Sequence, residues 1–233
     1  ATARELVQTV RLMSEVKVVR RWARSRRKEG APLALPKVEL KGGLAEIHLV
    51  AIGASTGGPV VLQTILSGLP KDFPVPLLIV QHIASGFVQG FAEWLAQSTG
   101  FPVRLAIHDE PLLPGRAYVA PDGFHTGVAS GGRIALSKDD PENGLRPSVS
   151  YLFRSVAKVY EQRAIGVLLT GMGNDGAQEL KLLKERGAVT IAQDQESSVV
   201  YGMPGEAIRL DAATYVFPPE GIALALTGMV NRR

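Results

Sequence analysis

The stretch Ile47-His48-Leu49-Val50-Ala51-Ile52-Gly53-Ala54-Ser55-Thr56-Gly57-Gly58 (residues 47–58) sets the fold class. Five of its first six residues are apolar, which predicts a buried strand over 46–52. A turn of small residues follows and matches Gly-x-Ser-x-Gly. A serine on such a turn is pushed clear of the sheet, and its small neighbours let a substrate carbonyl come close. Ser55 is therefore a candidate nucleophile.

The same turn allows a second interpretation. Its glycines could hold an anion at a helix N-terminus, where free backbone amides and the helix dipole favour negative charge. The dinucleotide fingerprint fails because Ser55 occupies its second glycine position, and the phosphate-loop pattern fails because no Lys-Ser/Thr follows. A non-catalytic anion- or nucleotide-binding module stays open as an alternative.

Beyond this stretch, apolar strand patterns alternate with helical ones. Further strands are expected over 77–81, 165–169 and 188–193, and helices over 58–67, 86–98, 148–160, 176–186 and 219–230. In the helix over 86–98 we expect Phe87, Phe91, Trp94 and Leu95 to face inward. Continuous apolar strands alternating with helices predict an α/β fold, a doubly wound and mostly parallel sheet with helices on both faces.

The segment 115–138 departs from this alternation. Three short strands are expected over 116–120, 123–128 and 133–137, joined by Asp-Gly and Gly-Gly turns. These turns are typical of hairpins. We therefore expect a small antiparallel β hairpin region in or at the edge of the fold.

The N-terminal region differs in composition from the rest of the chain. Apolar residues recur at helical spacing from Leu6 to Val16, which predicts an amphipathic helix over 3–27, and a Pro- and Gly-containing linker follows over 29–44. We expect residues 1–44 to form an N-terminal helix and linker, and 45–233 to form one catalytic domain. The 233 residues, 45% of them hydrophobic, suffice for one sizeable core.

Charge and composition exclude several classes of function. The net charge is +4, but residues 1–30 hold nine Lys or Arg against three Glu, giving +6, and the remainder carries −2. The main body is thus not expected to bind nucleic acid. The chain has no cysteine, and its four histidines lack metal-ligand spacing, so we expect no metal or cofactor. No membrane-length apolar run occurs, and we expect a soluble, cytoplasmic protein.

Three complementary groups follow predicted strands. Ser55 follows the first, His82 follows 77–81, and Asp175 follows 165–169 through a glycine-rich turn. Because the carboxyl ends of parallel strands lie at one edge of a sheet, these groups should meet there. Asp175 could instead only cap the helix from Gly176, and Asp194, after 188–193, is a rival carboxylate.

If they meet, His82 would take the proton from Ser55 during attack on a carbonyl and return it to the leaving group. Asp175 would hold the imidazole in the required tautomer. Backbone amides of Thr56 or of the Met172 turn would stabilise the oxyanion. The sequence so far predicts a serine hydrolase, and a generic esterase or peptidase is one form of it.

Six segments together carry a more specific resemblance. They are GASTGGP (53–59), IVQH (79–82), LLPGRAYVAP with DGFH (112–125), RPSVSYLFRSVA (146–157), LLTGMGNDGA (168–177) and AQDQESSVVYGMP (192–204). In this order they resemble the C-terminal catalytic domain of the chemotaxis protein-glutamate methylesterases. Two departures are Ile83-Ala84, where the family tends to have Met-Pro, and Ser150, where an aspartate is common.

The resemblance implies a Ser55, His82 and Asp175 triad, with Met172 contributing to the oxyanion site. It implies hydrolysis of glutamyl methyl esters on the cytoplasmic helices of methyl-accepting chemotaxis receptors, with glutamine deamidation as a second reaction. It also implies that residues 1–44 correspond to the end of a receiver domain, absent from this chain, and the linker after it.

Overall fold

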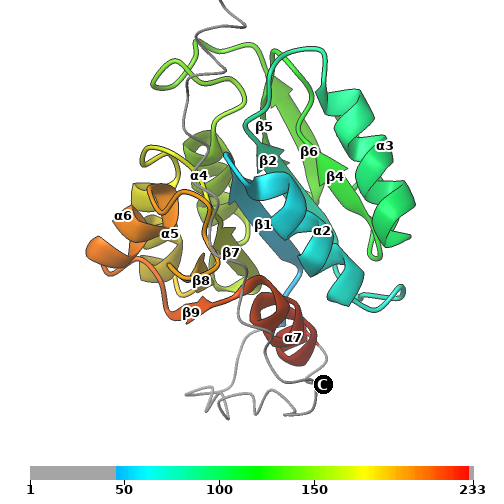
Figure 1. Cartoon of the computed structure of the whole chain (residues 1–233). Coiled ribbons are helices and arrows are strands. Elements are labelled where there is room, and N and C mark those ends of the chain that lie inside the picture. The colour runs from blue at the N-terminus through cyan, green and yellow to red at the C-terminus, as the bar shows by residue number, and fades with distance from the viewer. Residues whose placement is uncertain (1–45, 231–233) are drawn as a thin grey trace, which may run out of the picture. The chain divides into compact units, whose positions relative to one another are not determined.

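The computed structural model describes residues 46–230, so the predicted helix over 3–27 and its linker lie outside the described residues. The domain boundary at residue 45 stays a prediction for the same reason. Within the described part, strands and helices alternate as expected, and Figure 1 shows the helices packed around a central sheet.

Seven strands form one parallel sheet in the order β3-β4-β2-β1-β7-β8-β9. Their bounds are β1 Leu49–Ala54, β2 Leu77–Gln81, β3 Val103–Leu105, β4 Ala117–Val119, β7 Ala164–Leu168, β8 Val189–Gln193 and β9 Tyr215–Phe217. From β1 the chain first builds the sheet in one direction and later, from β7, in the other. The strand order therefore reverses between β1 and β7, where ligands bind in doubly wound folds.

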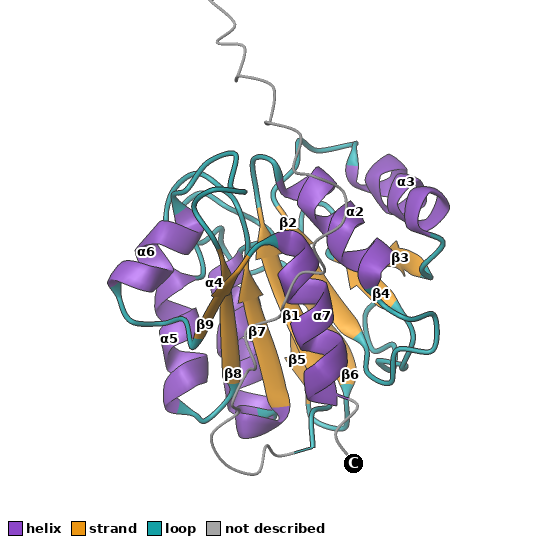
Figure 2. Cartoon of the chain, turned by 60° about the horizontal axis from the view of Figure 1, so that its bottom comes forward, coloured by secondary structure: helices purple, strands orange, loops and turns teal. Residues whose placement is uncertain are grey.

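Helices cover both faces of the sheet. They are α2 Gly58–Gly68, α3 Val88–Thr99, α4 Val149–Val159, α5 Ala177–Glu185, α6 Met203–Arg209 and α7 Pro219–Val230, with a short 3-10 helix at Glu161–Arg163. Residues of α2, α3 and α7 pack against one face, and residues of α4, α5 and α6 against the other. Alternate residues of β1 supply the two cores: Val50 and Ile52 face the first, Leu49 and Ala51 the second. The predicted fold class is confirmed, and Figure 2 shows the helices around the strands.

The expected hairpin region is confirmed in part. Strands β5 (His125–Ala129) and β6 (Arg133–Ser137) pair antiparallel and form a sheet of their own. The strand expected over 116–120 does not belong to this hairpin, however. It is β4, which lies between β2 and β3 in the main sheet and is parallel to both.

The expected inward face of α3 was wrong at two positions. The buried stripe contains Phe91 and Leu95 at helical spacing, but Phe87 is 66% exposed and Trp94 39%. Phe87 precedes the first residue of the helix, and Trp94 lies at the border of the stripe, where its ring stacks on Phe91. Both side chains therefore remain on the surface.

Candidate active site

The turn after β1 places Ser55 at the carboxyl edge of the sheet. The Ser55 N–H donates to the Thr170 carbonyl at 3.0 Å, and the Gly58 N–H donates back to the Ser55 carbonyl at 2.8 Å. Gly57 adopts a left-handed conformation with φ 83°, and a Cβ there would lie 2.6 Å from Val199. Only glycine fits this position, so the tight turn that carries Ser55 depends on it.

Strand pairing brings His82 beside Ser55. Ala54 and Gln81 are partners in the parallel ladder between β1 and β2, so the residues that follow them leave the sheet next to each other. The His82 N–H donates to the Ala54 carbonyl at 2.9 Å. The buried Gln81 side chain holds both residues, because its Nε2 donates to the carbonyls of Ser55 and His82, each at 2.8 Å.

The His82 ring and the Asp175 carboxylate form a hydrogen bond, with 2.9 Å between Nε2 and Oδ2. Asp175 is buried at 5% exposure and His82 is largely covered. With Asp175 ionised, Nε2 carries the proton, and Nδ1 is left to accept one. The Ser55 hydroxyl forms no hydrogen bond with His82 or with any other residue within 46–230.

Three further groups donate to the Asp175 carboxylate. They are the backbone N–H groups of Val149 at 2.6 Å and Ser150 at 3.0 Å and the Ser148 hydroxyl at 2.9 Å. Burial alone would raise the pKa of Asp175. The hydrogen bonds, led by that from His82 and joined by those from Ser150 and Val149, outweigh this penalty and lower the pKa from 3.8 to about 2. Asp175 is therefore ionised at neutral pH.

All three of these donors come from the beginning of α4. Ser148 is the N-cap of α4, and Val149 and Ser150 are its first residues. The free amides and dipole of a helix N-terminus favour a carboxylate. The alternative that Asp175 merely caps the following helix was wrong, because Gly176 is the N-cap of α5. The Gly176 N–H donates to the Ser150 hydroxyl at 2.9 Å and not to Asp175. Asp175 instead sits at the N-terminus of α4.

The rival carboxylate, Asp194, is held within its own loop. Its Oδ1 accepts from the backbone N–H of Ser197 at 3.1 Å and from the Ser197 hydroxyl, and its carbonyl accepts from the Ser198 hydroxyl. No hydrogen bond links it to His82 within the described part of the chain. Asp194 shapes the turn after β8 and is not paired with the imidazole.

The two expected oxyanion donors come from different turns: Thr56 follows Ser55 directly, and Met172 belongs to the turn after β7. The N–H groups of Thr56 and Met172 donate to no acceptor among residues 46–230. Gly171, which precedes Met172, approaches so closely that a Cβ there would lie 2.7 Å from the Ser55 Cβ. Unpaired amides in the Ser55 turn and in the Gly171 turn are the kind of donor that a developing oxyanion requires.

Sequence reasoning missed the residues that support this arrangement. The Thr170 hydroxyl donates to the Thr56 carbonyl at 2.9 Å, and the Thr170 N–H donates to the buried Gln193 side chain at 2.8 Å. The ring of buried His125 accepts from the Ser148 N–H through Nδ1, at 3.3 Å, and contacts the Asp140 carbonyl through Nε2, at 3.1 Å. Polar residues at apolar strand ends, such as Gln81 and Gln193, were the signal that could have revealed them.

The described residues contain neither a cluster of metal ligands nor a membrane-spanning helix. No group of three or more His, Cys, Asp or Glu within 46–230 is placed to hold a metal ion. In the same range, no helix combines the length and the hydropathy needed to cross a bilayer.

Comparison with known proteins gives consistent matches. The family model described as CheB methylesterase matches residues 50–226. A protein-glutamate methylesterase/protein-glutamine glutaminase of Syntrophus aciditrophicus is 58% identical over 98% of this chain, and one of Nitrosospira multiformis is 57% identical over 100% of this chain. The chain spans 65% of the length of each of these relatives.

A solved structure shows the same fold. The crystal structure of the Thermotoga maritima CheB methylesterase catalytic domain superposes with a TM-score of 0.76 at 39% sequence identity. The match covers 80% of this chain and all of that one.

Proposed function

The chain belongs to the CheB methylesterase family, and we propose that it hydrolyses methyl esters of glutamate side chains on the cytoplasmic helices of methyl-accepting chemotaxis receptors. We propose Ser55, His82 and Asp175 as its catalytic triad. One observation carries the proposal: a buried, ionised carboxylate holds the ring of a histidine that strand pairing places beside a half-buried serine.

The first half of the reaction transfers the acyl group to the enzyme. The Ser55 Oγ attacks the carbonyl carbon of the ester while His82 Nδ1 takes the hydroxyl proton. Asp175 stabilises the resulting imidazolium through Nε2. The N–H groups of Thr56 and Met172 donate to the oxyanion, and collapse of the tetrahedral intermediate releases methanol, which takes the proton from Nδ1.

The second half restores the enzyme. A water molecule attacks the acyl carbon and gives its proton to Nδ1 of His82. The Ser55–acyl bond breaks, the serine oxygen regains the proton, and a free glutamate side chain leaves. An amide can follow the same route with ammonia as the leaving group. The relatives' names include glutamine glutaminase, and we propose deamidation as a second activity of this site.

The proposal extends to location and to the rest of the protein. Cytoplasmic receptor helices require a cytoplasmic enzyme, and we propose that location. A receiver domain in the whole protein, which the resemblance implied, remains a prediction. The anion-binding alternative explains the unpaired amides of the Ser55 turn but leaves the His82–Asp175 pair without a role.

Methanol release from a methylated cytoplasmic receptor fragment tests the proposal. The Ser55→Ala variant should lose activity by at least about 10⁴-fold, because the attacking atom is gone. Its thermal unfolding should match that of the parent chain, since the Ser55 hydroxyl bonds to no described residue. Ser85→Ala, which alters an exposed serine of the loop after His82, is the matched control. Activity retained by Ser55→Ala would refute the assignment.

A further inference from the structure

We propose that an apolar groove between α2 and α3 docks an amphipathic helix of the protein substrate and so delivers its glutamyl ester to Ser55. The α2–α3 groove is lined by Pro59, Val60, Ile83, Phe87, Phe91 and Trp94 together with two glycines. This inference rests on the proposed function and names the surface that would recognise the substrate.

Residues that line the groove follow the candidate active-site residues directly along the chain. Ile83 directly follows His82, and Pro59 and Val60 lie in the first turn of α2, immediately beyond the Ser55 turn. A glutamyl ester is only a few bonds away from its own backbone. A protein that presents this group to Ser55 must therefore cover the adjoining surface, and on this side that surface is the α2–α3 groove.

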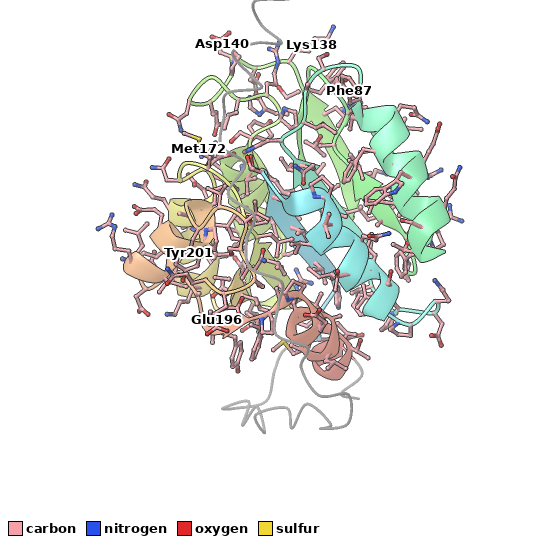
Figure 3. The ribbon with its side chains drawn as sticks, in the orientation of Figure 1. Phe87, Lys138, Asp140, Met172, Glu196 and Tyr201 are labelled. Carbon is pink, nitrogen blue, oxygen red and sulfur yellow. The ribbon has the colours of Figure 1, made fainter. Side chains whose placement is uncertain are left out.

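The chemistry of the groove suits a protein partner. Val60 is 64% exposed and Phe87 66%, and no residue lining the groove is charged. Exposed apolar side chains continue beyond the Ser55 turn with Met172 and with Val199, which packs against Gly57. Figure 3 shows Met172 and Phe87 on different sides of the beginning of α2. Apolar side chains gathered around a reactive group are typical of a protein-binding surface.

Gly90 adds an independent observation. It lies in the first turn of α3 and lines the groove, although glycine is a poor helix former. A Cβ at Gly90 would meet no atom within 4 Å in the described part of the chain, so packing there does not require a glycine. Close approach of a partner backbone is a reason for glycine at such a position.

The shape of the groove favours a helix as its occupant. It follows α3 from Phe87 to Trp94, about two helical turns or roughly 10 Å. A groove between two helices accepts the ridge of a third, with apolar anchors three, four and seven residues apart. The substrate helix would thus carry apolar residues about one and two turns away from the glutamyl ester.

Steady-state kinetics on two substrates test the docking surface. One substrate is a methylated cytoplasmic receptor fragment, and the other is a small N-acetylglutamate γ-methyl ester that cannot reach the groove. The variants are Val60→Gln/Phe87→Gln, which makes the groove polar, and Gly90→Leu, which fills it with a good helix former. Ile107→Gln/Leu224→Gln is the matched control, because these exposed apolar residues lie after β3 and on α7.

Both groove variants should raise KM for the receptor fragment at least tenfold, with kcat unchanged and turnover of the small ester within twofold of the parent chain. The control variant should behave like the parent on both substrates. An unchanged KM in both groove variants would overturn the docking surface, while parental activity on the fragment would still uphold the proposed function. An equal loss on the small ester would also overturn it, because the site itself would then be distorted.

Two other results would overturn the docking surface in different ways. If the parent chain turns over the small ester but no receptor fragment, the proposed function fails, and the docking surface fails with it. If the parent chain forms a dimer that Val60→Gln/Phe87→Gln dissociates, a second copy occupies the groove instead. Size measurement over a range of concentrations distinguishes that case.

Discussion

Asp175 and Asp194 follow neighbouring strands of the sheet, β7 and β8, yet the structure gives them opposite surroundings. Asp175 accepts hydrogen bonds from the His82 ring and from the start of α4, elements far from it in the sequence. Asp194 accepts from Ser197, three residues away in the same loop. Both carboxylates follow a strand end. Asp175 accepts hydrogen bonds from residues far away in the sequence, whereas Asp194 accepts them from its own loop.

This difference separates the proposed catalytic carboxylate from one that only shapes its own loop. Asp194 is partly exposed, and its carboxylate accepts hydrogen bonds from the N–H and the hydroxyl of Ser197 in the same turn. Asp175 is buried, and it stays ionised because a helix N-terminus and an imidazole surround it. A buried anion held in this way can orient and charge-stabilise a histidine without being protonated by it.

The largest expected effect is a difference in activity between Asp175→Asn and Asp194→Asn. In Asp175→Asn the side-chain amide would donate toward Nε2 of His82, moving the ring proton to Nδ1 and blocking transfer from Ser55. We expect kcat on a methylated receptor fragment to fall about 10⁴-fold. Asp194→Asn keeps an acceptor for Ser197 and should stay within about threefold of the parent chain. Equal losses in the two variants would remove the distinction between the loops.

Much of the fold could be predicted because its signals are local. Strand β2 and helix α7 have the predicted bounds, since an apolar run and an amphipathic stripe are read directly from the residues. Strands β3 and β9 and helix α6 were not predicted. Each strand has only three residues, and α6 contains Pro204 and Gly205, so none has a clear pattern. The assignment of 116–120 to the hairpin failed because sheet membership depends on distant partners.

The candidate site could likewise be predicted where its residues follow strands, but not where it depends on contacts between distant elements. Topology alone predicts Ser55, His82 and Asp175 at one edge of the sheet. The structure pairs His82 with Asp175, and the ladder between β1 and β2 places Ser55 next to His82, while the complete triad stays a proposal. The support from Ser148 and from Gln81 was not foreseen. Ser148 looks like an ordinary N-cap, and its contact with Asp175 arises only when α4 packs against the loop after β7.

The second effect is the pH dependence of stability. The folded chain lowers the pKa of Asp175 from 3.8 to about 2, so its ionised form stabilises the fold. The contribution is complete above the unfolded pKa and is lost as pH falls through the folded one, in total about 2 kcal/mol. Denaturant unfolding at several pH values checks this. The stability difference between parent and Asp175→Asn should shrink below pH 4, and a difference that does not change with pH would contradict this account.

The smallest expected effect comes from removing the serine hydroxyls that donate hydrogen bonds to the two carboxylates. Ser148→Ala removes the α4 cap and one donor to Asp175, and we expect a loss of about 1 kcal/mol in unfolding free energy. Its rate should fall less than tenfold, because Asp175 keeps the bonds from His82, Val149 and Ser150.

Ser197→Ala is the counterpart in the Asp194 loop. It removes a donor to Asp194 and a partner of Gln193, and it should cost a similar or smaller free energy of unfolding with no change in rate. The two variants are thus nearly matched in stability and differ in activity. A rate loss in Ser197→Ala equal to that in Ser148→Ala would mean that the loop after β8 also positions the reacting groups, through Gln193 and Thr170, whose hydroxyl holds the Thr56 carbonyl.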